Sequence, residues 1–158
     1  MAPVSLSTII VGKVLGGAVF GLVMAGVMTL ISLMFLNTVV SQILPFLVVL
    51  TLTVLVHSAL GALVSVAVKE VFEAQTLANF FRFPMVFLCG VFLPVEAMPI
   101  PVQVVAHLLP LTYSVDALRQ TVIGDLNPLM VLRDVFALAL FLTAFLTLAT
   151  RLLKKNLE

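Results

Sequence analysis

The sequence predicts an all-α membrane protein with about four transmembrane helices and a pair of short amphipathic helices that re-enter the membrane before the last span. Apolar residues make up 63% of its 158 residues and charged residues only 9%, which leaves too little polar surface to cover a water-soluble core. No charged residue occurs between Lys13 and Lys69, a stretch more than twice the roughly 20 residues that cross a bilayer as a helix. This stretch has to cross twice. Residues 14–35 are apolar on every side and lack the alternation of a membrane β-strand, so the spans are helical.

The composition also indicates which binding partners the chain is expected to have. The net charge of +1 gives no argument for nucleic-acid binding, and the lipid bilayer is the expected surroundings. The single cysteine, Cys89, excludes an internal disulfide and a zinc site built from cysteines. His107 and Gln103, four residues apart, make no credible ligand set either. We therefore expect no metal site.

The whole chain, residues 1–158, is expected to form a single membrane domain. The first two spans form a hairpin joined by the uncharged segment "NTVVSQILP". A proline-rich segment separates the third span from the last, and the chain ends in the basic tail "RLLKKNLE". The predicted ranges are 14–36, 46–68 and 76–94 for the first three spans, 95–128 for the proline-rich segment and 133–153 for the last span.

Four crossings place both termini on one side of the membrane. Most basic residues fall on that side: Lys13, Lys69, Arg151, Lys154 and Lys155, with Arg82 just inside the third span, against Arg119 and Arg133 on the other. Because basic residues accumulate on the cytoplasmic side, we expect both termini in the cytoplasm of a multi-pass protein of the plasma (inner) membrane.

The stretch "GVFLPVEAMPIP" is expected to end the third helix at the outer surface. Pro94, Pro99 and Pro101 lack an amide donor and restrict the residue before them, so a helix that reaches Leu93 is not expected to continue. Glu96 agrees with this position, since a carboxylate is far less costly at the interface than in the hydrocarbon centre.

The segment that follows is not an ordinary polar loop. "PVQVVAHLL" and "TYSVDALRQTVIG" are each apolar on one face and polar on the other. We expect two short amphipathic helices, separated by Pro110, that dip back toward the membrane.

Several separated motifs resemble the permease subunits of ABC-2 type exporters. "FPMVFLCGVFLPVEAMP" and then "LLPLTYSVDALRQ" are similar to the family's pattern of an apolar helix, a Gly turn, Phe-x-Pro, a Met-Pro step, an Asn-Pro-Leu-Thr-Tyr-like turn and Asp-x-x-Arg. Leu109 replaces the usual Asn, and Cys89 stands where Ser is common. The beginning, "APVSLSTIIVGKVLGG", resembles the family's cytoplasmic segment ahead of its third span.

This resemblance implies a function. Two permease subunits, as a homodimer or heterodimer, would each pair with an ATP-binding subunit and move a drug, lipid or glycan outward. ATP would be hydrolysed on that separate subunit, so this chain is expected to be no enzyme and to bind no cofactor. Residues 1–13 would be the end of a cytoplasmic coupling segment, with Pro3, Ser5 and Lys13 toward the ATPase. Since the family has six spans, the resemblance predicts that the first two are missing here.

The resemblance also implies an outer cap over the exit, formed by residues 97–124. Asp116 and Arg119 lie three residues apart on one helix and are predicted to pair, as a local contact that fixes the cap or as part of an outer gate. Glu96 would pair with Arg119 or His107. The expected cap and gate residues are Pro94, Glu96, Pro99, Pro110, Tyr113, Asp116 and Arg119.

Polar residues within the spans have two interpretations each. His57 is either a neutral histidine that shares a hydrogen bond with a neighbouring helix or part of the transport path. Arg82 either snorkels to the interface or pairs with Glu73 or Glu70, or it lines the path.

Small residues in the first span, Gly17, Gly21 and Ala25 among them, form a ladder that permits close helix approach. The ladder predicts packing within the chain or a contact between two permease subunits.

Two other functions compete with export. An intramembrane protease would need a facing Ser and His or two histidines around a Glu, and Ser58 beside His57 points to a different helix face. "VGK" at 11–13 lacks the Gly and the Ser or Thr of a phosphate-binding loop. A truncated permease that serves as a membrane scaffold or regulatory subunit stays as the alternative to transport.

Overall fold

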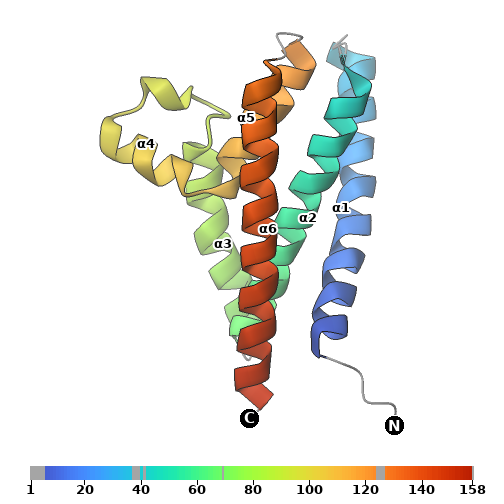
Figure 1. Ribbon diagram of the computed structural model, residues 1–158, viewed down its shortest axis with the longest axis vertical. Helices are drawn as coiled ribbons and strands as arrows, with labels where there is room; N and C mark the ends of the chain where they lie inside the picture. Colours follow the sequence, from blue (N-terminus) through green and yellow to red (C-terminus); the bar gives the residue numbers. More distant parts are fainter. Residues whose placement is uncertain (1–5, 37–39, 41, 69, 124–126, 158) are drawn as a thin grey trace.

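The computed structural model describes residues 6–36, 40, 42–68, 70–123 and 127–157 (Figure 1). These residues form helices and turns and contain no strand, so the all-α prediction is confirmed for them. The elements in chain order are α1 (Leu6–Leu36), α2 (Ile43–Ala67), α3 (Val71–Leu88), the 3₁₀ turn η1 (Val95–Ala97), α4 (Ile100–His107), α5 (Pro110–Ile123) and α6 (Pro128–Leu157).

Three of the described helices are long and apolar enough to cross a membrane. They contain the stretches Thr8–Phe35, Ile43–Ala67 and Pro128–Asn156 of α1, α2 and α6. Helix α3 has only 18 residues and is less apolar, because Glu73 and Arg82 lie between its apolar residues. The chain is therefore a multi-pass membrane protein with at least these three membrane-length helices.

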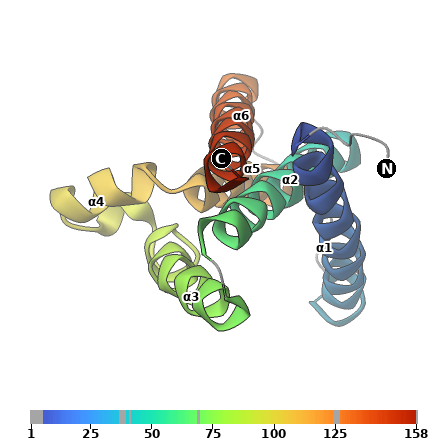
Figure 2. The same ribbon diagram turned by 90° about the horizontal axis from the view of Figure 1, so that it is seen from below.

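Helix α2 lies at the centre of the molecule. It packs against α1 on one side, α6 on another, and α3 and α5 on a third (Figure 2). The buried core cluster joins α1, α2 and α6 and consists of Ile10, Val14, Ala59, Ala62, Val66 and Ala149. Half of this cluster is alanine, and such small residues let helices approach closely in lipid, where the hydrophobic effect supplies little attraction between them.

The glycine ladder of α1 faces α2 at two positions. An added Cβ at Gly21 would lie 2.7 Å from Cγ1 of Val54, and one at Gly17 would collide with the Ser58 hydroxyl. That hydroxyl donates to the carbonyl of Val14 at 2.7 Å. Gly17 and Gly21 thus serve packing within the chain, the first of the two interpretations. Ala25 lies half-buried one turn further along α1.

Helix α3 ends earlier than the proline pattern predicts. It stops at Leu88, where the Cys89 amide donates to the Met85 carbonyl at 3.0 Å. Gly90 then adopts φ +88°, a left-handed conformation that residues with a side chain rarely adopt. The expectation that the helix would run to the prolines was wrong, because this glycine turns the chain before Pro94 is reached.

Two short helices occur where the amphipathic pattern predicts them. Helix α4 projects sideways from the bundle, α5 lies behind α6, and Pro110 is the first residue of α5 (Figure 1). The start of α1 and the end of α6 lie at the same, lower end of the molecule. Helix α1 begins at Leu6, ahead of the predicted span at 14–36, and α6 extends beyond the predicted 133–153 at both ends.

Candidate functional site

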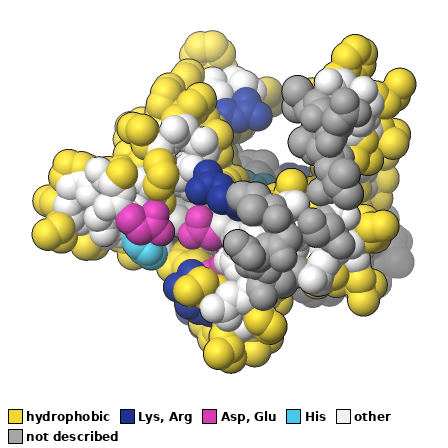
Figure 3. All heavy atoms as spheres, turned by 90° about the horizontal axis from the view of Figure 1, so that it is seen from above, with side chains coloured by type: hydrophobic (Ala, Val, Ile, Leu, Met, Phe, Trp, Pro, Cys, Tyr) yellow, Lys and Arg dark blue, Asp and Glu magenta, His cyan; other side chains and the backbone are white. Residues whose placement is uncertain are grey.

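Most of the predicted site residues that the structure describes lie in two places: the cap, which we define as η1, α4 and α5, and a cavity between α2, α3 and α5 that His57 and Arg82 line. Figure 3 shows the upper end of the molecule, where acidic, basic and histidine side chains gather in the middle and hydrophobic side chains surround them.

Two neighbouring residues of the Leu-Thr-Tyr motif close the end of α4. The Thr112 hydroxyl donates to the Ala106 carbonyl at 2.6 Å, and the Tyr113 hydroxyl donates to the His107 carbonyl at 2.9 Å. The last carbonyls of a helix have no partner within it, so these bonds satisfy groups that a helix end leaves free. The Tyr113 ring also packs near Phe141 of α6, at 6.1 Å between centroids. The motif therefore ties α4 to α5 and the cap to α6.

The prolines of the cap begin its elements. Pro94 and Pro99 precede η1 and α4, and their carbonyls accept bonds from Ala97 at 3.0 Å and Val102 at 2.9 Å. Proline is well suited to these positions because the first amides of a helix have no helical partner. The Gln103 amide then donates to the Met98 carbonyl at 2.8 Å, which folds α4 back onto its own lead-in.

Arg119 links the cap to α3. Its guanidinium donates to the carbonyl of Gly90 at 2.7 Å, across 29 residues of chain. The predicted pair of Arg119 with Asp116 was wrong: no hydrogen bond or ion pair joins them, because the guanidinium is engaged by the turn after α3. Glu96 is exposed, and its carboxylate pairs with neither Arg119 nor His107, contrary to expectation. The His107 ring instead lies 2.7 Å from the Gln103 carbonyl.

Asp116 lies half-buried on α5. Burial raises its pKa above the ordinary value of an aspartate, and the negative charges of Asp134 and Glu96 raise it further, against the opposing charges of Arg119 and Arg133. A carboxyl in this setting holds its proton to higher pH than an exposed one.

Asp134 is a polar residue that our sequence reasoning missed. It lies in the first third of α6 with 0% of its side chain exposed, and its Oδ1 accepts bonds from Arg133 at 2.8 and 3.0 Å. Its Oδ2 is buried with no partner among the described residues. The available signal was a carboxylate inside an apolar helix, a feature that marks function or a specific pair.

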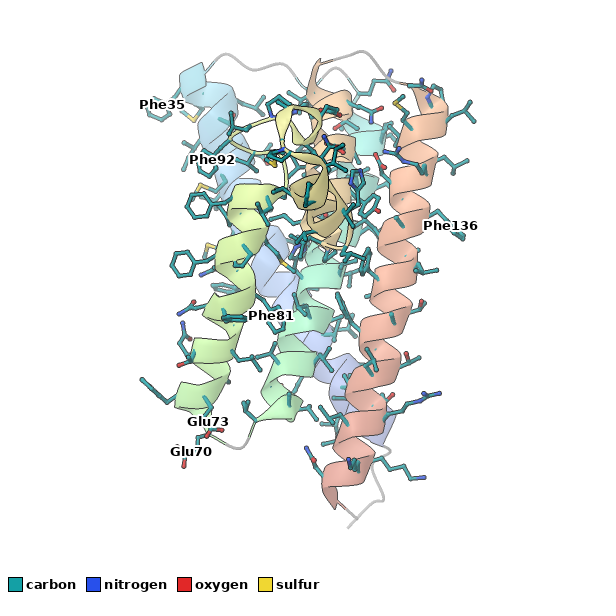
Figure 4. All side chains as sticks on the ribbon, turned by 90° about the vertical axis from the view of Figure 1, so that its left-hand side faces the viewer. Phe35, Glu70, Glu73, Phe81, Phe92 and Phe136 are labelled. Atoms are coloured by element: carbon teal, nitrogen blue, oxygen red, sulfur yellow. The ribbon has the colours of Figure 1, made fainter. Side chains whose placement is uncertain are left out.

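The structure brings His57 and Arg82 together. They lie on α2 and α3 and line one cavity of about 280 Å³, which Leu111 of α5 helps to close. Arg82 is exposed and makes no hydrogen bond or ion pair with any described residue, so the predicted pair with Glu73 or Glu70 was wrong. Both glutamates lie at the lower end of α3 (Figure 4), whereas Arg82 lies in the second half of this helix.

His57 bonds within its own helix rather than to a neighbouring one, which corrects the expectation. Its Nδ1 lies 2.8 Å from the Thr53 carbonyl, and its Nε2 is buried without a partner among the described residues. The hydroxyl of Thr53 is likewise buried and has no hydrogen-bond partner among the residues that the structure describes.

Lys13, the described member of the expected coupling residues, lines an open groove between α1 and α2 and donates to the Ser65 hydroxyl at 3.3 Å. The other two, Pro3 and Ser5, lie outside the described residues.

The sequence matches the model of a known protein family. The model of the ABC-2 type transporter family matches residues 1–123, which include α1 to α5. The chain belongs to the ABC-2 type transporter family. The family match ends at α5, so the cap with its Leu-Thr-Tyr motif and its Arg119 lies within the matched part.

Two curated relatives are similar along the chain. The inner membrane transport permease YadH of Escherichia coli (strain K12) is 29% identical over 156 residues, which are 99% of this chain and 60% of that protein. Nodulation protein J of Rhizobium leguminosarum bv. trifolii is 31% identical over 110 residues, 69% of this chain and 41% of that protein. The chain thus spans about three fifths of the length of the permease. No solved structure matches it.

Proposed function

We propose that this chain is the transmembrane permease subunit of an ABC-2 type exporter and moves its substrate outward across the inner membrane. The observation that carries the proposal is the family match over the helices and the cap. The similarity to a protein named as an inner membrane transport permease supports the membrane and the role.

The proposed topology has four crossings, with α3 as the fourth span beside α1, α2 and α6. Helix α3 runs from the lower end of α2 up to the cap, which supports a crossing despite its polar residues (Figure 4). The lower end carries Lys13 and the basic end of α6, so the positive-inside rule favours cytoplasmic termini. The helices α4 and α5 then form a re-entrant pair on the outer side.

The proposed energy source is a separate ATP-binding subunit, two copies of which act with two permease subunits. The lower end of α1, with Lys13, is the proposed contact with that subunit. This contact lies in the part of the chain that the family model matches.

Affinity purification of the protein from its native membrane in mild detergent, followed by mass spectrometry, tests the proposal. We expect a soluble ATP-binding-cassette protein in near-equal amount. The variant Lys13→Glu should lower its recovery, whereas Arg151→Gln, which changes another exposed basic residue, should leave it unchanged. If the chain is recovered without such a protein, the permease coupling fails, and a scaffold function takes its place.

A further inference from the structure

The middle of α2 carries polar atoms that the described structure leaves without partners. The Thr53 hydroxyl and the His57 Nε2 are both buried, one turn apart on the same helix. Because Nδ1 of His57 faces the Thr53 carbonyl, the neutral ring has its proton there and offers Nε2 as an acceptor. A buried acceptor without a donor is unfavourable, and a hydroxyl or amide donor on a bound molecule would satisfy it.

Arg82 stands on the opposite wall of the same cavity. Its guanidinium is permanently charged, carries five donors and has no partner among the described residues. No Asp or Glu is among the residues that line the cavity. The charge of this site therefore favours an anionic group, above all a planar or tetrahedral oxyanion that a guanidinium binds through two bonds.

The cavity has an apolar neighbour. A second cavity of about 430 Å³ shares the walls Leu60, Val64, Phe81 and Met85 with the first and extends to Phe141 and Phe145 of α6. All residues that line this second cavity are apolar. Phe81 of α3 lines both cavities.

We propose that these two adjoining cavities bind an amphipathic molecule with an anionic head, the head at Arg82 and His57 and the apolar chain in the second cavity. The assignment of this molecule as the exported substrate rests on the proposed function. The binding itself does not, since it follows from the residues that line the two cavities.

Equilibrium binding of radiolabelled dodecyl phosphate to the full chain in phosphatidylcholine nanodiscs tests the site, with empty nanodiscs subtracted. We expect Arg82→Gln to weaken binding at least about tenfold, the effect of losing a charged hydrogen-bonded partner. Arg82→Lys should retain part of the affinity because it keeps the charge. Arg151→Gln is the matched control, since Arg151 is exposed and lines neither cavity, and it should bind as the natural chain does.

Two further probes separate the head from the chain of the ligand. Butyl phosphate should bind at least about tenfold more weakly than dodecyl phosphate, because it buries fewer methylene groups. Inorganic phosphate should bind more weakly still, and equal binding of it would overturn the amphipathic assignment in favour of a free anion. Equal binding of dodecyl phosphate to the natural chain and to Arg82→Gln would overturn the site altogether.

The binding of dodecyl phosphate does not depend on whether the chain recovers an ATP-binding protein. A chain that binds dodecyl phosphate through Arg82 but recovers no ATP-binding protein overturns the proposed function and leaves the site standing. If the chain recovers the ATP-binding protein but the Arg82→Gln variant binds dodecyl phosphate as well as the natural chain does, the site is overturned and the proposed function stands.

Discussion

The bundle of α1, α2 and α6 and the cap are held together by different interactions. In the bundle, long helices satisfy their own backbone groups, and close approach depends on small residues such as Gly17, Ala59 and Ala62. In the cap, short helices leave backbone carbonyls free, and the side chains of Thr112 and Tyr113 satisfy them. Added volume should therefore disrupt the bundle, whereas loss of a single polar atom should loosen the cap.

The largest effect is expected where volume is added between α1 and α2. Gly17→Leu should lower the free energy of unfolding by about 3 kcal/mol, because its side chain would collide with Ser58 and displace that hydroxyl from the Val14 carbonyl. Denaturation of the purified protein in detergent, followed by circular dichroism, measures this change.

Gly16→Leu is the matched control, one residue away on the same helix. An added Cβ there meets nothing within 4 Å, so we expect little loss of stability. If both variants destabilise the chain equally, close packing against α2 is not what the glycine at 17 provides.

A smaller effect is expected at the charged pair near the top of α6. Arg133→Gln should cost about 2 kcal/mol, since it removes the hydrogen bonds to the buried carboxylate of Asp134. The double variant Arg133→Gln with Asp134→Asn should regain part of this stability, because it leaves no unpaired buried charge. The same denaturation measurement checks it, and a double variant as unstable as the sum of the two single ones would contradict the coupling.

Within the cap, Thr112→Val should cost about 1 kcal/mol because it removes the donor to the Ala106 carbonyl, whose residue is fully buried. Tyr113→Phe should cost less, since the His107 carbonyl lies in an exposed residue and is open to water when the bond is lost. Hydrogen exchange at the end of α4 follows both variants. Faster exchange in Tyr113→Phe than in Thr112→Val would reverse the expected order.

The smallest effect concerns the pH dependence at Asp116. Because the folded state raises the pKa of this carboxyl, the folded protein holds more protons than the unfolded one between the two pKa values. Its contribution to stability is thus full at low pH and declines as pH rises through this window, which begins near the ordinary aspartate pKa of about 3.9. Asp116→Asn should remove that decline, so thermal unfolding of the two proteins should diverge as pH rises from about 4. Parallel curves would contradict the role of burial at this position.

Length, composition and local pattern were sufficient to predict the helical class, the long apolar helices and the two short amphipathic ones. These properties follow from the bilayer thickness and from the periodicity of apolar residues along the sequence. The motifs from Phe83 to Pro99 and from Leu108 to Gln120 were sufficient for the family.

Only the tertiary structure decided which groups the polar side chains contact. Asp116 and Arg119 have the spacing of a helical pair, yet Arg119 reaches the Gly90 carbonyl from 29 residues away. His57 and Arg82 lie on separate helices, and only the packing of α3 beside α2 makes them walls of one cavity. A side chain binds the nearest unsatisfied group in space, and spacing along one helix does not reveal which backbone group another segment brings within reach.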